Sequence, residues 1–200
     1  MITFAQFIEE ECRNKGISNL LEFCQKIQAS AQRLDSLIQD ALNYSRAILE
    51  DWPVHAVDMD RLLTELIDSY PDLQGWKGAI RIESPLPQVM GNDAALTQCF
   101  SNLLRNAVKF VRPGDAPKVR VWAERRGSRV RIWVEDKGIG IRPQVRKRIF
   151  DMFQRATHEY EGTGIGLAIV RKVAHRMGGS VGVESEEGEG SRFWVELVAV

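Results

Sequence analysis

The chain has 200 residues, 44% of them hydrophobic, which is enough for one ordinary domain and a smaller appendage. Lysine plus arginine and aspartate plus glutamate number 27 each, so no net field draws the chain to nucleic acid or to an anionic membrane surface. No apolar run reaches the length of a membrane span, so we expect no membrane contact within this chain. The three cysteines lack metal-ligand spacing, which indicates buried thiols and a cytoplasmic location.

Residues 1 to about 51 predict a helical segment. An apolar stripe from Phe4 to Cys12 predicts a short helix that Gly16 ends, and Ser18 can cap a longer second helix. Along the second helix, a heptad seam of apolar and small residues recurs at steps of four and three: Leu20, Cys24, Ile27, Ala31, Leu34, Ile38, Ala41, Ser45 and Ile48. One long helix and one short helix cannot bury this seam, which favours a homodimer through the N-terminal helices. Packing on the next domain is the alternative.

Residues 52–200 predict an α+β domain. The order of helices and hairpin-connected strands predicts a two-layer α/β sandwich on a mixed, mostly antiparallel sheet. We expect a linker strand at 54–58, a helix at 60–70, a loop at 71–78, strands at 79–83 and 89–90, a helix from Asn92 to about Val111, a hairpin of 119–123 with 130–134, loops to Gly166, a helix to about Met177, and strands at 181–183 and 193–197. The helix at 60–70 has a predicted core face of Leu62, Leu63, Leu66 and Ile67. The helix from Asn92 has a predicted core face of Leu96, Cys99, Phe100, Leu103, Leu104, Ala107 and Phe110.

On the helix from Asn92, the residues Asn102, Asn106 and Lys109 stand at i, i+4 and i+7, which puts them on one polar stripe. A carboxamide oxygen is a suitable ligand for Mg²⁺, and a lysine is a point charge for phosphate. The ordinary alternative for such a triplet is a solvated helix face.

The predicted hairpin ends in Asp136-Lys137-Gly138-Ile139-Gly140. An aspartate at the end of a buried strand can accept a hydrogen bond from an exocyclic amine, and glycines let a flat ring lie against the backbone. A common Asp-Gly turn is the alternative.

Two further segments follow. In I-F-D-M-F-Q-R, two aromatic residues stand three apart before Arg155, a pattern that a core helix turn with a surface arginine would also give. From Gly162, three alternate glycines lead into an apolar helix whose N-terminus can bind phosphate. The preceding polar run, 154–161, has no strand pattern, so an ordinary dinucleotide-binding fingerprint does not fit.

Together and in this order, N-L-L-R-N-A-V-K-F, D-K-G-I-G-I, I-F-D-M-F-Q-R and G-T-G-I-G-L resemble the asparagine, first glycine, phenylalanine and second glycine boxes of sensor histidine kinases. That family belongs to the wider class that includes gyrase, Hsp90 and MutL. The heptad helix, with R-L-D-S-L-I-Q-D-A-L-N-Y-S-R, looks like the second helix of the family's dimerisation and phosphotransfer domain. The segment H-E-Y-E-G-T-G-I-G-L looks like the phytochrome-type branch. The resemblance therefore implies part of the dimerisation hairpin in 1–51 and the catalytic ATP-binding domain in 52–200.

The resemblance implies a site for ATP and Mg²⁺. Asp136 would bond the adenine amine in a pocket shaped by Gly138 and Gly140. Asn106, helped by Asn102, would hold Mg²⁺. Lys109 and Arg155 would meet the phosphates, Arg155 the γ-phosphoryl group, so the implied catalytic residues are Asn106, Lys109 and Arg155. The remaining implied nucleotide-binding residues, beside a lid at 154–161, are Phe153, Gly162, Thr163, Gly164, Ile165, Gly166 and Leu167.

Two departures from the family pattern carry information. Asn102 stands where the gyrase and Hsp90 relatives have a water-activating glutamate, and because an amide cannot act as a general base we expect slow ATP hydrolysis. None of His55, His158 and His175 has the family's acceptor pattern, a histidine followed by an acidic residue and soon by a proline. We expect the acceptor to lie upstream, so that this chain binds Mg-ATP without phosphorylating itself. Thr3 with Gln6 could cap a natural start, and a naturally shortened protein is the alternative.

The predicted function is the ATP-binding catalytic domain of a sensor histidine kinase, from whose phosphohistidine the receiver domain of a response regulator collects the phosphoryl group. One alternative is a regulatory dimerisation module with a vestigial nucleotide site, against which the intact boxes argue. Another is an anti-sigma-type serine kinase, which the heptad helix disfavours because those proteins lack a helical hairpin before the catalytic domain. No nucleic-acid partner is expected.

Overall fold

The computed structural model describes residues 18–49, 52–157, 160 and 162–200. The predicted short helix from Phe4, its end at Gly16, the cap by Thr3 and the His158-Glu159 pair lie outside these residues. The chain divides into two compact units, Met1–Asn43 and Tyr44–Val200, and the predicted domain boundary after residue 51 stays a prediction. None of the described helices is both long and apolar enough to cross a membrane.

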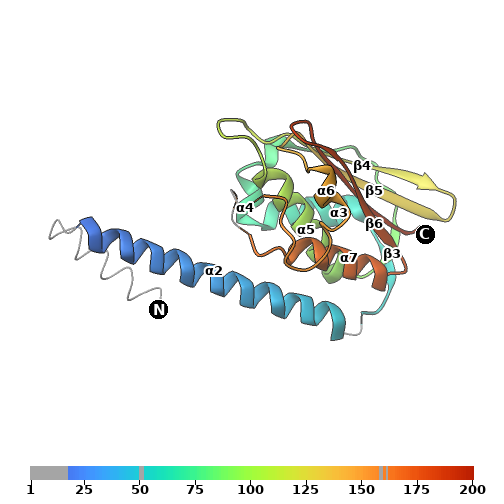
Figure 1. Cartoon of the computed structure of the whole chain (residues 1–200). Helices are drawn as coiled ribbons and strands as arrows, with labels where there is room; N and C mark the ends of the chain where they lie inside the picture. Colours follow the sequence, from blue (N-terminus) through green and yellow to red (C-terminus); the bar gives the residue numbers. More distant parts are fainter. Residues whose placement is uncertain (1–17, 50–51, 158–159, 161) are drawn as a thin grey trace. The chain divides into compact units, whose positions relative to one another are not determined.

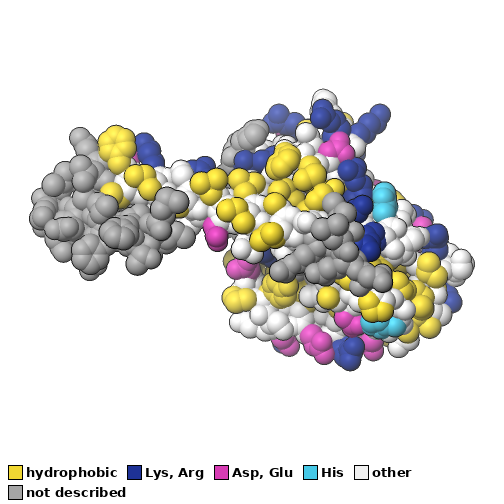
Figure 2. Space-filling model, turned by 90° about the horizontal axis from the view of Figure 1, so that it is seen from below, with side chains coloured by type: hydrophobic (Ala, Val, Ile, Leu, Met, Phe, Trp, Pro, Cys, Tyr) yellow, Lys and Arg dark blue, Asp and Glu magenta, His cyan; other side chains and the backbone are white. Residues whose placement is uncertain are grey.

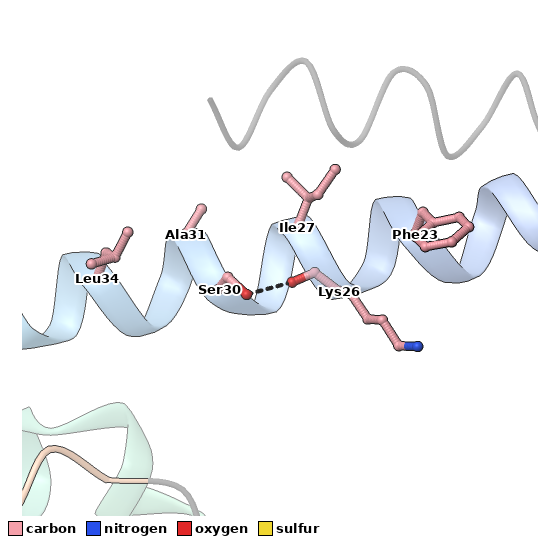
Figure 3. Close-up of a pocket in the computed structure, with 6 residues that line it drawn as sticks. All are labelled: Phe23, Lys26, Ile27, Ser30, Ala31 and Leu34. Atoms are coloured by element: carbon pink, nitrogen blue, oxygen red, sulfur yellow. Dashed lines mark hydrogen bonds between the residues drawn. The ribbon is translucent and has the colours of Figure 1, made fainter.

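The long helix predicted from Ser18 is continuous: α2 spans Ser18–Leu49. Its apolar residues form one open stripe, because residues three or four apart share a helix face. Its large exposed members are Phe23, Ile27, Leu34, Ile38 and Leu42. Figure 2 shows hydrophobic side chains along this helix, and in Figure 3 Ile27, Ala31 and Leu34 project from one side of it while the Lys26 ammonium points away. The stripe contains Ile27, Leu34 and Ile38 of the predicted seam and is widened by Phe23 and Leu42, whereas Cys24 is buried.

The second unit is built on a five-stranded sheet with the strand order β2-β4-β5-β7-β6. Its strands are β2 (Ile80–Ile82), β4 (Val119–Arg126), β5 (Arg129–Asp136), β6 (Ser180–Glu186) and β7 (Gly190–Val198). Only the β2–β4 pair is parallel, so the sheet is mixed and mostly antiparallel, as predicted. The linker strand β1 (His55–Val57) pairs instead with β3 (Val89–Gly91) in a separate antiparallel ribbon.

Three helices cover one face of this sheet and make the predicted two-layer sandwich (Figure 1): α3 (Met59–Ser69), α5 (Asp93–Lys109) and α7 (Gly166–Arg176). The predicted core faces of α3 and α5 are buried, apart from Phe110. Asn92 caps α5 by accepting a hydrogen bond from the backbone N–H of Ala95 at 3.1 Å, which starts the helix where the sequence indicated. Its position matters because α5 carries the predicted polar stripe.

The opposite face of the sheet is covered by tryptophan side chains that pack against one another and against arginine. Trp122 and Trp133 stack with their ring centroids 5.6 Å apart, and Trp194 meets Trp133 edge-on at 6.4 Å. The guanidinium carbon of Arg131 lies 3.9 Å from the Trp194 ring, and the same guanidinium pairs with Glu196 at 2.8 Å. These cation–π contacts and ion pairs let the second face carry large apolar side chains without a second helical layer.

Three local predictions were wrong. The loop expected at 71–78 contains α4 (Pro71–Gln74) and leads into the 3₁₀-helix η1 (Lys77–Ala79), and the loops before Gly166 contain α6 (Pro143–Arg146). Both short α-helices begin at a proline, whose fixed φ suits the first helical position. The helix α5 ends at Lys109 rather than Val111, since Phe110 leaves helical geometry with φ −86° and ψ 52°. Phe110 is therefore half-buried beside Tyr160 instead of in the core.

Candidate functional site

The polar stripe of α5 forms as predicted. Asn102 donates to the carbonyl of Gln98 at 2.8 Å, and its Oδ1 faces α7, since a β-carbon placed on Gly166 would lie 2.7 Å from it. Asn106 is half-buried, and no described residue bonds its carboxamide. Lys109 is exposed, with its Nζ 5.8 Å from the centre of the Phe110 ring. The stripe thus presents an amide oxygen and an ammonium group along one line.

Asp136 is the last residue of β5 and is buried, with 7% of its surface exposed. Its Oδ1 accepts hydrogen bonds from the backbone N–H groups of Gly138 at 2.9 Å and Ser191 at 3.3 Å. Burial raises the pKa of this carboxyl to about 6, although those two N–H donors act in the opposite direction. Since no described residue bonds Oδ2, that oxygen is available to accept a hydrogen bond from a ligand.

The two glycines after Asp136 are required by contacts within the protein. A β-carbon on Gly138 would overlap the carbonyl oxygen of Phe110, and one on Gly140, whose φ is +70°, would overlap that of Glu186. The residue between them, Ile139, donates to the Phe110 carbonyl at 3.0 Å and accepts from the N–H of Gly188 at 2.8 Å. The loop is therefore wedged between the end of α5 and the β6–β7 turn, a packing role that the sequence analysis did not foresee.

The second glycine segment runs beside the polar stripe of α5. A β-carbon on Gly162 would lie 4.0 Å from Nζ of Lys109, and Gly166 faces Asn102. Gly164, with φ +75°, accepts a hydrogen bond from the N–H of Phe153 at 2.9 Å. The three other predicted residues lie in the same segment: Thr163, whose Oγ1 accepts from the N–H of Ile165 at 3.3 Å, the buried Ile165, and the half-buried Leu167 in the first turn of α7. The segment thus brings the start of α7 to Asn102 and Lys109.

The two aromatic residues of the phenylalanine box have different environments. Phe150 is buried and meets Phe193 edge-on, with ring centroids 6.2 Å apart. Phe153, predicted in the nucleotide site, is 63% exposed and has a φ of +62°, an uncommon conformation for a side chain with a β-carbon. Such a strained residue persists where its surroundings hold it, here through its bond to Gly164.

Arg155 is the one predicted phosphate ligand whose described contacts lie away from the stripe. Its guanidinium donates to the carbonyl of Tyr160 at 2.5 Å. Tyr160 in turn donates to the carbonyl of Val111 at 2.6 Å and lies 5.4 Å from the Phe110 ring. Tyr160 therefore connects Arg155 to the residues that follow α5.

The asparagine segment lies on α5, and the structure brings both glycine segments to this helix. Asn102 and Lys109 meet the second glycine segment, and the Phe110 carbonyl meets the first. Sequence reasoning missed Phe110 as a site residue and missed Ser191, which follows Gly190 and bonds Asp136. The segment Gly190-Ser191-Arg192-Phe193 gives only a weak signal, because its importance depends on strand register. Among the described residues, no cluster of three or more His, Cys, Asp or Glu residues could hold a metal ion by itself.

Comparison with known proteins agrees with this arrangement. The family model of the histidine kinase-, DNA gyrase B-, and HSP90-like ATPases matches residues 91–199, more than half of the chain. The chain belongs to this family. Cyanobacterial phytochrome A of Nostoc sp. is 34% identical over 196 residues, covering 97% of this chain and 26% of its own length. The sensor histidine kinase AruS of Pseudomonas aeruginosa is 38% identical over 188 residues, covering 86% of this chain and 18% of its own length.

Solved structures of the family have the same fold. Full-length ShkA in complex with AMPPNP superposes with a TM-score of 0.69 at 32% identity, over 91% of this chain and 40% of that one. The mycobacterial sensor histidine kinase MprB gives a TM-score of 0.57 at 27% identity, over 74% of this chain and 98% of that one. The second unit is thus the ATP-binding catalytic domain of the sensor histidine kinase family, and the chain spans about a quarter or less of the curated relatives' length.

Proposed function

We propose that the second unit positions Mg-ATP for transfer of its γ-phosphoryl group to a histidine. The observation that carries this proposal is that α5 meets both glycine segments. Its polar stripe lies beside Gly162 and Gly166, and the Phe110 carbonyl at its C-terminal end accepts from Ile139 in the first glycine segment. Four kinds of group thus lie around one helix. They are a carboxylate oxygen that can accept a hydrogen bond from an amine, an amide oxygen, an ammonium group and the N-terminus of a second helix. Those are the groups that a purine triphosphate with a divalent cation requires.

The adenine end of the site is Asp136. Its free Oδ2 would accept a hydrogen bond from the exocyclic amine, and its Oδ1 stays fixed by Gly138 and Ser191. A carboxylate accepts but does not donate, so it favours a 6-amino purine over a 6-oxo purine.

The phosphate end lies at the start of α7. The capping position of this helix is Ile165, which offers no side-chain acceptor to the N–H groups of the first turn. Those N–H groups and the positive end of the helix dipole would bind phosphate oxygens, and Lys109 beside Gly162 would add its charge. We assign Arg155 to the γ-phosphoryl group, a role that requires its bond to the Tyr160 carbonyl to be exchanged.

The donor set fits Mg²⁺ only when the nucleotide supplies part of the coordination shell. The half-buried carboxamide of Asn106 offers one oxygen, helped by Asn102 on the preceding turn. When bound, the ion would neutralise phosphate charge as the bond to the leaving ADP breaks. Asn102 cannot deprotonate water, so hydrolysis would be slow and the phosphoryl group would be kept for a nitrogen nucleophile.

We assign the receiver domain of a response regulator as the partner that takes the phosphoryl group onward. The acceptor histidine would come from a helix other than those described, so this chain by itself would bind nucleotide without becoming labelled. The exposed apolar stripe of α2 would pair with that of a second copy, since three of its residues, Ile27, Leu34 and Ile38, follow the heptad steps of seven and four. We assign this phosphoryl transfer to the cytoplasm, where cysteines such as the buried Cys24 and Cys99 stay as free thiols.

A calorimetric titration with ATP, with and without Mg²⁺, tests the proposal. We expect saturable binding that Mg²⁺ strengthens, and no radiolabel on the protein afterwards. Asn106→Asp adds a carboxylate beside the phosphates, so the ratio of the affinities with and without Mg²⁺ should change by about tenfold. Gln144→Glu, the same amide-to-carboxylate change at an exposed position, is the control. No binding at millimolar ATP would favour a dimerisation module with a vestigial site, and label on serine of a partner would favour a serine kinase.

A further inference from the structure

Three polar side chains form a row across the sheet at the end that carries Asp136. Asp136 on β5 is the register partner of Ser191 on β7, which is in turn the partner of Ser185 on β6. Asp136 and Ser191 are buried, and Ser185 is half-buried. Ser185 belongs to none of the four sequence segments that predicted the nucleotide site.

The hydroxyl of Ser185 makes three hydrogen bonds. It accepts from the N–H of Ile141 at 2.8 Å, donates to the carbonyl of Gly190 at 2.8 Å, and lies 2.9 Å from Oγ of Ser191. A serine hydroxyl has a single hydrogen, and Ser185 uses it at Gly190. The hydroxyl of Ser191 must therefore be the donor in the third contact, which fixes its direction.

These bonds connect the two segments that flank Asp136. Ile141 ends the loop that contains Gly138, and Gly190 with Ser191 begins β7. The two N–H groups that occupy Oδ1 of Asp136 come from these same segments, from Gly138 and from Ser191. Ser185 thus connects the two segments that supply the N–H groups of Gly138 and Ser191. Because these N–H groups bond Oδ1 of Asp136, they leave Oδ2 to accept from a ligand.

We propose that Ser185 is a positioning residue for purine recognition, which holds Oδ2 of Asp136 in the direction of the exocyclic amine of adenine. This inference rests on the proposed nucleotide site and adds to it a residue that does not touch the nucleotide. Its consequence is specific: removal of the hydroxyl should weaken discrimination between a 6-amino and a 6-oxo purine. Contacts to the triphosphate, at the other end of the site, should be unaffected.

The test compares Ser185→Thr with Ser185→Val, two β-branched residues of similar shape that differ in the hydroxyl. Affinities for ATP and inosine triphosphate are measured for each variant by calorimetry or competition, with Mg²⁺ at pH 7.5. We expect the threonine variant to keep its ATP affinity within about threefold and the valine variant to lose about tenfold. The affinity for inosine triphosphate should be equal in the two. Ser180→Ala, on the same strand but away from the site, should match the unmodified protein for both nucleotides.

The outcomes separate this inference from the proposed function. Equal ATP affinity in the two variants, or a parallel loss for both nucleotides, would overturn the positioning role. Failure of the unmodified protein to bind ATP would overturn the proposed function and this inference with it. Both nucleotides report on the same folded fraction, so their affinity ratio decides the matter even if valine lowers the melting temperature.

Discussion

The carboxamide oxygen of Asn102 faces the first residue of α7, where a β-carbon on Gly166 would lie 2.7 Å from it. The contact joins the asparagine segment to the second glycine segment. It places a polar group of α5 at a helix N-terminus, where a phosphate would bind. The absence of a side chain at Gly166 would therefore serve the proposed nucleotide site as well as the start of α7.

Gly166→Ala should lower the affinity for Mg-ATP by about tenfold or more, because the new methyl group must displace the Asn102 amide. The free energy of unfolding should change by less than about 1 kcal/mol, since alanine is a good residue for a helix. Calorimetry and thermal unfolding measure the two effects. Gly75→Ala is the control, because nothing lies within 4 Å of its β-carbon position. Undiminished binding by Gly166→Ala would show that Asn102 does not contribute to the site.

Asp136→Asn should stabilise the protein above pH 6. The pKa of the Asp136 carboxyl is raised from 3.8 to about 6, so the folded protein holds this proton more tightly than the unfolded chain. The free energy of unfolding therefore falls as pH rises from about 4 to about 6, by roughly 3 kcal/mol in total. Asparagine keeps the acceptor for Gly138 and Ser191 without the buried charge.

The measurement for this variant is the melting temperature against pH. The asparagine variant should melt higher than the unmodified protein at pH 8, with the gap closing towards pH 4, and should bind ATP weakly at both. Asp115→Asn, at an exposed position, should show no such gap. If Asp136→Asn melts lower at pH 8, the burial cost assigned to the carboxylate is wrong.

Recognition of adenine should weaken as pH falls through about 6, because only the ionised Asp136 presents a pure acceptor to the amine. The triphosphate also titrates in this range, so the informative quantity is the ratio of the affinities for ATP and inosine triphosphate. This ratio should fall about tenfold between pH 6.5 and pH 5. A ratio that stays constant would remove Asp136 from adenine recognition.

A charge on the apolar stripe of α2 should prevent self-association without affecting the nucleotide site. Leu34→Glu and Ile38→Glu each place a carboxylate among exposed apolar residues, so burial against a second copy would cost several kcal/mol. Sedimentation velocity should show the unmodified chain as a dimer and each variant as a monomer, all with the same ATP affinity. Gln32→Glu, on the other side of the helix, is the control. Dimers that persist in both variants would exclude the stripe as the interface.

Local patterns predicted much of this structure because their causes are local. The period of Leu62, Leu63 and Leu66 predicted the buried face of α3, and the side chain of Asn92 predicted the start of α5. The spacing of Asn102 and Asn106 predicted that both lie on one helix stripe, because residues four apart share a helix face. The short helices α4 and α6 begin at Pro71 and Pro143, where loops were expected. The fixed φ of proline suits a first helical turn as well as a loop, so the residue type did not distinguish the two.

The sequence by itself determined the fold class, the order of the longer helices and the strands, the family and the residues of the four segments, since these depend on side-chain period and on residues near one another in the chain. Only the tertiary structure decided which segments touch. Strand register brought Ser185 and Ser191 to Asp136, and chain packing exposed Phe153 and bonded Arg155 to Tyr160. Such contacts depend on how distant segments pack, which no local pattern encodes.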